Sequence, residues 1–324
     1  MLARSTGSRL FGVVDTLSAG YRIVNRRPWL VLGPVALDLF LWFGPRVSVA
    51  PLIGPLLARP DLARGLGPND AQAFEATRQA ILAMADEVNL LAMLAPIWFG
   101  VPSIMPALGG GRGSFTFVTS WATALLIGLG VSLVGTLLGC LYRAVIAQQV
   151  RDDAVSGRAL PAEALRAWSR SIGLALLVVG IGALLALPVA IVTVGAALIA
   201  RELASFGVTI AMTLALWAWL YLFFAPDAIF VGRVGPLRAI ARSIALVRAN
   251  FWAAFRLVAL VQIILLGMGQ VWLALATRAP WGPALGIVGN AYIASGLIAA
   301  SMLFYRERSE ALLAARPVAA VHEA

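Results

Sequence analysis

Lysine is absent from this 324-residue chain, and cysteine and histidine occur once each. Without lysine, the chain has neither a Schiff-base lysine nor a P-loop lysine. The single Cys140 leaves no partner for an intramolecular disulfide, and the single His322 excludes a metal site built from His and Cys as well as Ser-His-Asp catalysis. The sequence therefore predicts no catalytic residue, no metal site and no cofactor, and it favours a protein that is not an enzyme.

Charged residues are also scarce. Only 12% of the chain is charged and 61% is hydrophobic, with a mean hydropathy of +0.90. Soluble globular domains are only about 45–50% apolar, so a soluble core could not hide this much apolar surface. The composition predicts an integral membrane protein.

All 25 basic residues are arginine, and the formal net charge is +10. Such a charge on a soluble protein would suggest nucleic acid as a partner. Here the arginines gather at the ends of apolar runs, where lipid headgroups and membrane orientation account for them. We predict membrane lipids as partners, another membrane protein or complex as a further candidate partner, and no nucleic acid.

Apolar runs predict an all-α fold, a polytopic bundle of six transmembrane helices. A span needs about 20 apolar residues. The runs cover residues 29–43, 121–142, 172–194, 203–225, 255–276 and 283–304. The first run is short for a span, although Trp29 and Trp42 stand where interfacial tryptophans would bracket it.

The topology depends on residues 90–108, an apolar stretch broken by three prolines. If this stretch does not cross, both termini and the segments 143–170 and 226–256 share one side, which then holds 18 of the 25 arginines. The positive-inside rule assigns that side to the cytoplasm. We therefore predict a re-entrant or interfacial hairpin at 90–108, in a multi-pass protein of the bacterial cytoplasmic (inner) membrane with both termini cytoplasmic.

Two segments have the apolar spacing of amphipathic surface helices. Residues 10–24 form one, and residues 237–251 the other, with Leu237, Ile240 and Ile244 on its apolar face. The outer loop, residues 45–120, carries a third predicted helix at 71–88 that begins after Asn69.

An internal repeat relates LRAWSRSI at 165–172 to LRAIARSI at 237–244, each just before a span. The repeat suggests three units, each a surface helix followed by two spans. The predicted organisation is a single membrane domain, residues 1–324. It contains the N-terminal amphipathic helix (1–27), the first span pair with the long outer loop (28–142), a second unit (143–225), and a third unit with the tail (226–324).

The segment PDAIFVGRVGPLRAIARSIALVRANFW, followed by two spans and LFYRERS, resembles a bacterial six-span family. That family includes YciC-like proteins and the membrane domain fused to some glycerophosphodiester phosphodiesterases. The resemblance covers about the last hundred residues and implies the architecture only, because this chain has no phosphodiesterase domain. The matching positions are Pro226, Ala239, Ser243, Asn250, Phe251, Trp252, Tyr305 and Arg306.

Candidate site residues fall into two groups. Four arginines on the surface segments are predicted to contact lipid headgroups or a partner: Arg166, Arg170, Arg238 and Arg242. Three polar residues lie inside predicted spans: Asp38, Gln262 and Asn290. A carboxylate in a span can serve a proton or ion relay, but on so short a span we favour a structural hydrogen bond for Asp38. Interhelical packing is favoured for the other two over a transport path.

A glycine-rich stretch, GGGRGS at 109–114, lacks the lysine and the preceding strand of a phosphate loop, so a flexible connector is predicted.

Two functions remain open. We favour a non-enzymatic scaffold or assembly partner, and the alternative is a permease-type component that moves a small or lipidic substrate.

Overall fold

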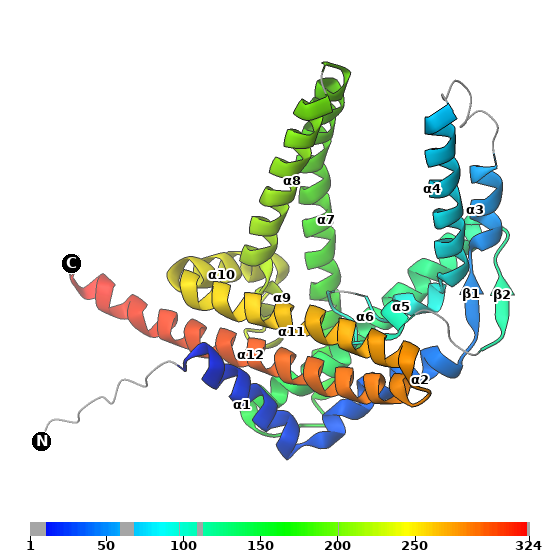
Figure 1. Cartoon of the computed structure of the whole chain (residues 1–324). Coiled ribbons are helices and arrows are strands. Elements are labelled where there is room, and N and C mark those ends of the chain that lie inside the picture. The colour runs from blue at the N-terminus through cyan, green and yellow to red at the C-terminus, as the bar shows by residue number, and fades with distance from the viewer. Residues whose placement is uncertain (1–10, 59–67, 97, 109–112, 200, 323–324) are drawn as a thin grey trace, which may run out of the picture. The chain divides into compact units, whose positions relative to one another are not determined.

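The fold is all-α, as the sequence predicts (Figure 1). The computed structural model describes residues 11–58, 68–96, 98–108, 113–199 and 201–322. In chain order the helices are α1 (Val13–Arg26), the short 3-10 helix η1 (Pro28–Val31), α2 (Leu32–Phe43), α3 (Ala50–Leu57), α4 (Pro68–Glu87), the 3-10 helix η3 (Leu90–Leu94), α5 (Met105–Leu108), α6 (Trp121–Asp152), α7 (Leu160–Ile199), α8 (Arg201–Leu222), α9 (Ala225–Phe230), α10 (Pro236–Ala249), α11 (Phe251–Arg278) and α12 (Gly282–His322).

Among the described residues, five helices are long and apolar enough to cross a membrane, which supports a membrane protein. They cover Trp121–Asp152, Leu160–Thr193, Ser205–Phe230, Phe251–Arg278 and Gly282–Ala314. The predicted first span corresponds to a shorter apolar helix, Pro28–Phe43. At about 1.5 Å per residue this helix falls short of the roughly 30 Å hydrocarbon core, so its crossing stays a prediction.

The chain folds as two compact units. Unit 1 comprises Met1–Arg27, Arg143–Leu265 and Gly296–Ala324, and unit 2 comprises Pro28–Tyr142 and Leu266–Ser295. The predicted division into three sequential units stays a prediction.

In unit 2, residues 90–108 do not form one continuous helix. The stretch contains η3 and α5, with irregular backbone around the prolines between them. Proline lacks the amide hydrogen that a helix interior needs. The backbone passes close to α6, because a Cβ on Gly135 or Gly139 would collide with the backbone of Leu94 or of Phe99. The two glycines therefore permit a contact between α6 and the broken segment.

The described part of the predicted outer loop contains more secondary structure than the sequence indicated. In addition to the predicted helix, which appears as α4, the structure contains α3 and two short strands, β1 (Arg46–Ser48) and β2 (Phe115–Phe117), paired in parallel. The Asn89 side chain accepts hydrogen bonds from the amides of Val47 (3.0 Å) and Leu91 (3.1 Å), which fixes β1 to the start of η3. The helix α4 begins at Pro68, so Asn69 is not its N-cap.

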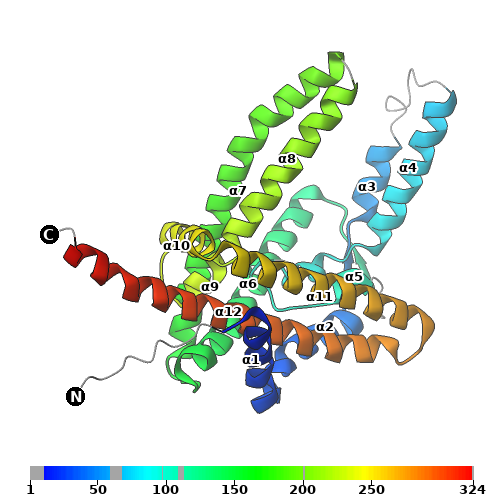
Figure 2. The same cartoon turned by 60° about the vertical axis from the view of Figure 1, so that its left-hand side comes forward.

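In unit 1, α7 and α8 lie side by side as a hairpin, and α9 and α10 contact its base (Figures 1 and 2). The Ser243 hydroxyl in α10 donates to the carbonyl of Tyr221 in α8, at 2.6 Å. This bond ties α10 to the hairpin.

The two predicted surface helices, α1 and α10, bury small residues together with Val24 in α1 and Leu246 and Val247 in α10. In α10 the fully buried positions include Ala239 and Ser243, whereas Leu237 is 68% exposed. In α1, a Cβ on Gly20 would meet the backbone of Gly296 and Ala300 in α12. Small side chains let helix backbones approach closely. On the predicted apolar face of α10, Leu237 is exposed, whereas Val247 is fully buried.

The two copies of the octamer repeat have matching burial, since Ala167 and Ser171 in α7 are buried like Ala239 and Ser243 in α10. Their contexts differ. The first copy continues without a break into the apolar part of α7, whereas α10 ends at Ala249 and α11 starts afresh at Phe251. In the second predicted unit, the repeat and the following apolar run therefore share one helix, and the three-unit organisation stays a prediction.

Candidate functional site: an arginine pocket

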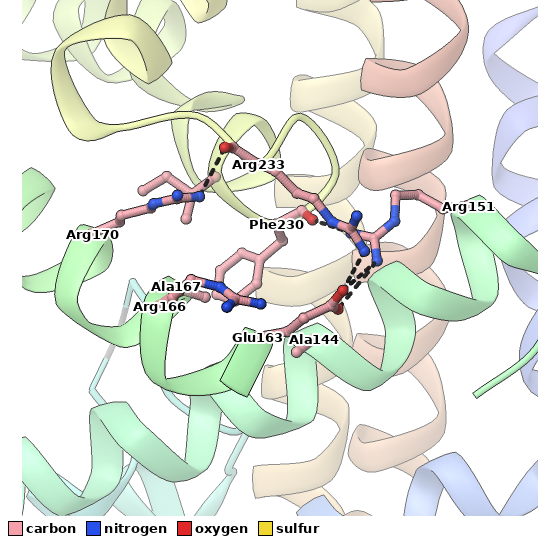
Figure 3. Close-up of a pocket in the computed structure, with 9 residues that line it drawn as sticks. Ala144, Arg151, Glu163, Arg166, Ala167, Arg170, Phe230 and Arg233 are labelled. Carbon is pink, nitrogen blue, oxygen red and sulfur yellow. Dashed lines mark hydrogen bonds and ion pairs between the residues drawn. The ribbon is translucent and has the colours of Figure 1, made fainter. Parts of the chain in front are cut away.

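Two of the four predicted contact arginines, Arg166 and Arg170, line one cavity of about 270 Å³ in unit 1. The cavity, here called the arginine pocket, is lined by the end of α6, the start of α7, and α9 with the loop after it (Figure 3). Its lining residues are Ala144, Arg151, Glu163, Arg166, Ala167, Arg170, Ile229, Phe230 and Arg233.

Helical spacing places the α7 residues together. Glu163, Arg166 and Arg170 follow one another at steps of three and four residues, which lie on one face of a helix. The α6–α7 connection is short, residues 153–159, so the end of α6 returns Arg151 to the same level. Arg233 completes the wall from the loop between α9 and α10, where its φ of 51° turns the chain sharply.

Glu163 is the central acceptor of the pocket. Its carboxylate accepts from the side-chain nitrogen of Gln148 at 3.0 Å and from Arg151 at 3.2 Å, and it pairs with Arg233. The Glu163 and Arg151 side chains are 15% and 13% exposed, so this pairing is largely shielded from water.

Backbone carbonyls position two of the arginines. Arg151 donates to the carbonyl of Phe230 at 2.8 Å, and Arg170 donates to the carbonyl of Arg233 at 2.8 Å. Among the described residues, no carboxylate pairs with Arg166, and its guanidinium points toward Phe230 in Figure 3. Four guanidinium groups against one carboxylate leave the wall with a formal charge of +3.

Such a wall suits an anion. Guanidinium groups bind phosphate and carboxylate oxygens through paired, charge-assisted hydrogen bonds. The lining offers no thiol, hydroxyl or imidazole side chain to attack a substrate. Within the described ranges, no group of His, Cys, Asp and Glu could hold a metal ion.

The other two predicted arginines lie outside the pocket. Arg238 lines a neighbouring apolar groove, together with residues of α7 and the start of α10. Arg242 is exposed and lines neither the pocket nor the groove. The structure therefore brings Arg166 and Arg170 together and leaves Arg238 and Arg242 apart from them.

The predicted intramembrane residues have separate environments. Asp38 in α2 is fully buried and accepts hydrogen bonds from the hydroxyl of Ser103 and the amide of Ile104 (3.4 Å). Gln262 and Asn290 are half-buried. None of the three lines the arginine pocket or the groove. The contacts of Asp38 fit the structural hydrogen bond that we favoured, although its role stays a prediction.

Sequence reasoning missed Arg151, Glu163 and Arg233, which complete the pocket. It also missed Asp227, a buried carboxylate in α9 that accepts from Ser301 and faces the charge of Arg143. Asp227 belongs to the PDAIF segment, where a carboxylate beside an apolar run was a usable signal. Glu163 stands three residues before Arg166 on the same helix face, whereas Arg151 and Arg233 come from other elements and gave no local signal.

The glycine-rich stretch falls mostly outside the described residues, which resume at Gly113. There the carbonyl of Ser114 accepts from the amide of Arg46 at 2.8 Å, and this bond leads into the pairing of β1 with β2.

Fold and pocket together define a helical membrane protein with a cationic pocket at the end of α6 and the start of α7. Comparisons with protein-family models, curated proteins and solved structures found no match. The resemblance to YciC-like proteins and the phosphodiesterase membrane domain therefore stays a prediction.

Proposed function

We propose that this protein is a non-enzymatic integral membrane protein that binds a phosphate-bearing anion in the arginine pocket and acts as a scaffold or assembly partner at the membrane surface. The observation that carries the proposal is the convergence of four arginines, from three parts of the chain, on one cavity with a single carboxylate.

The location of the pocket supports this function. Arg166 and Arg170 precede the apolar part of α7, and Arg151 follows the apolar part of α6. If both helices cross the bilayer, the pocket lies at the level of the headgroups, where phosphate groups are concentrated. By the positive-inside rule this is the cytoplasmic side of the bacterial inner membrane, with both termini on that side.

A scaffold role agrees with the chemistry of the wall, which offers donors for binding and positioning. Ligand occupancy would neutralise part of the +3 charge, and it would stabilise the contact between α6, α7 and α9 by mass action.

The test is a titration of the purified full-length protein in neutral detergent with inorganic phosphate at low ionic strength. Charge-assisted hydrogen bonds contribute about 1.5–3 kcal/mol each. Changing Arg166→Gln and Arg170→Gln together should therefore weaken phosphate binding tenfold or more.

The matched control changes two exposed arginines outside the pocket, Arg22→Gln and Arg248→Gln, and removes the same charge. Phosphate affinity should change less than twofold. Equal losses in the two double variants would mean that phosphate responds to net charge alone, and the proposed function would be wrong.

A further inference from the structure

A second cavity begins where the arginine pocket ends. It is a groove of about 640 Å³ lined by Gly173, Leu176, Leu177, Gly235, Pro236, Leu237 and Arg238. Apart from Arg238, its walls carry no charged side chain. An elongated apolar ligand fits such walls better than water does.

The groove and the pocket share two parts of the chain. On α7, Arg170 lines the pocket and Gly173, one helical turn further, lines the groove. After α9, Arg233 lines the pocket and Gly235 lines the groove. The hydrogen bond from Arg170 to the carbonyl of Arg233 joins these two parts where one cavity gives way to the other.

The backbones of α7 and α10 meet at this junction. A Cβ on Gly173 would come within 3.0 Å of the ring of Pro236, so glycine lets α10 start close to α7. Beyond this contact Leu176 and Leu237 are both 68% exposed, and they leave open the space between the two helices.

From this continuity of a cationic pocket with an apolar groove, we infer that the ligand is an anionic phospholipid. Its phosphate occupies the arginine pocket and one acyl chain lies along the groove between α7 and α10. This inference rests on the proposed function, and it names the ligand.

Polarity and size both support this occupant. Along α7 the order is Glu163, Arg166 and Arg170, then Gly173 and Leu177, which matches the order of headgroup and acyl chain in a lipid. The pocket is smaller than the roughly 300–1,000 Å³ of common small-molecule sites and holds a headgroup, not a whole lipid.

The experiment measures lipid retention by native mass spectrometry on the full-length protein, with dioleoyl-phosphatidylglycerol and dioleoyl-phosphatidylcholine as probes. The wild type should retain the anionic lipid at least tenfold better than the zwitterionic one. Filling the groove with Leu177→Trp and Leu237→Trp should reduce retention of phosphatidylglycerol at least fivefold. Because the arginines are untouched, the affinity for inorganic phosphate should stay within twofold.

The control is Leu184→Trp, an exposed position on α7 two turns beyond the groove, which should leave lipid retention unchanged. If the groove variant retains phosphatidylglycerol as well as the wild type and still binds phosphate, the acyl chain lies elsewhere and only this inference fails. If the wild type binds phosphatidylglycerol and inorganic phosphate with equal affinity, the acyl chains add nothing to binding and free phosphate is the ligand. If phosphate binding does not depend on Arg166 and Arg170, the proposed function itself fails.

Discussion

At the scale of single residues, Glu163 decides how the arginine pocket behaves without a ligand. Its carboxylate holds Arg151 and Arg233 and takes the place that an incoming anion would take. It lowers the positive charge of the wall and also keeps two of its donors in position. Removing it should therefore change affinity and stability in opposite directions.

We predict that Glu163→Gln raises phosphate affinity several-fold, most visibly at low salt, because the formal charge of the wall rises by one. The free energy of unfolding should fall by about 1–2 kcal/mol, since two arginines lose a charged acceptor. Titration and chemical denaturation in detergent measure these two effects. As a control, Glu310→Gln removes an exposed partner of Arg306 and should cost less than about 0.5 kcal/mol. Unchanged phosphate affinity in Glu163→Gln would show that the carboxylate does not compete with the ligand.

Asp38 allows a second prediction for a single side chain. Asp38→Asn keeps an acceptor for the amide of Ile104 and a partner for Ser103, so expression and stability should survive. Asp38→Leu leaves both groups buried without a partner and should lower the free energy of unfolding by about 1–3 kcal/mol. Thermal denaturation monitored by size-exclusion chromatography compares the two variants. Normal stability of the Asn variant with loss of a measured activity would instead favour the permease alternative.

At the scale of elements, glycine has two different effects within α6. Gly139 allows the carbonyl of Phe99 to lie against the helix, whereas a Cβ on Gly130 would meet nothing within 4 Å. Changing glycine to alanine at each position therefore distinguishes the effect of packing on stability from the effect of helix propensity.

We predict that Gly139→Ala destabilises the protein by about 1–3 kcal/mol, because overpacking forces the broken segment away from α6. Gly130→Ala should be neutral or stabilising by up to about 1 kcal/mol, the usual gain in a helix interior. Thermal denaturation of both variants in the same detergent measures the difference. Equal stability would mean that the contact between α6 and residues 94–100 does not form.

The long helices were predictable because an apolar run of span length has few ways to satisfy its backbone in a bilayer. The parallel strands were not, since β1 and β2 pair across roughly 70 residues and each has only three. The break after α10 was not predictable from the repeat either, because it coincides with a tertiary contact. Asn250 stands 72 residues after Val178 and accepts from Arg308 at 2.8 Å, whereas valine at the equivalent position continues α7.

Two of the four pocket arginines were predictable from the sequence. Arg166 and Arg170 stand out because they lie directly before an apolar run. Arg151 and Arg233 join them only through tertiary contacts with Glu163, and no spacing rule connects positions that lie 82 residues apart.

At the scale of the whole molecule, α6, α11 and α12 each contribute residues to both units. The topology of the membrane helices decides on which side of the membrane the proposed lipid site lies. Orientation therefore has to be measured in the intact chain.

We predict that single cysteines at Ala154 and Gly235, on a Cys140→Ala background, resist an impermeant thiol reagent in intact cells, while a cysteine at Ala71 reacts. Ala154 and Ala71 are exposed, and a Cβ on Gly235 would meet nothing within 4 Å, so access depends on topology. Permeabilised cells, in which all three should react, are the control. Labelling of Gly235 from outside would reverse the orientation and with it the assignment of residues 90–108.

One hydrogen-bonded link extends from the pocket to the exposed connection between α6 and α7. Gln148 donates to Glu163, and its side-chain oxygen accepts from the amide of Ser156 at 2.9 Å, in the connection between α6 and α7. An anion that draws Arg151 or Arg233 away from Glu163 alters the charge that Gln148 faces. If the proposed lipid binds, the conformation of residues 153–159 would then depend on whether the pocket is occupied.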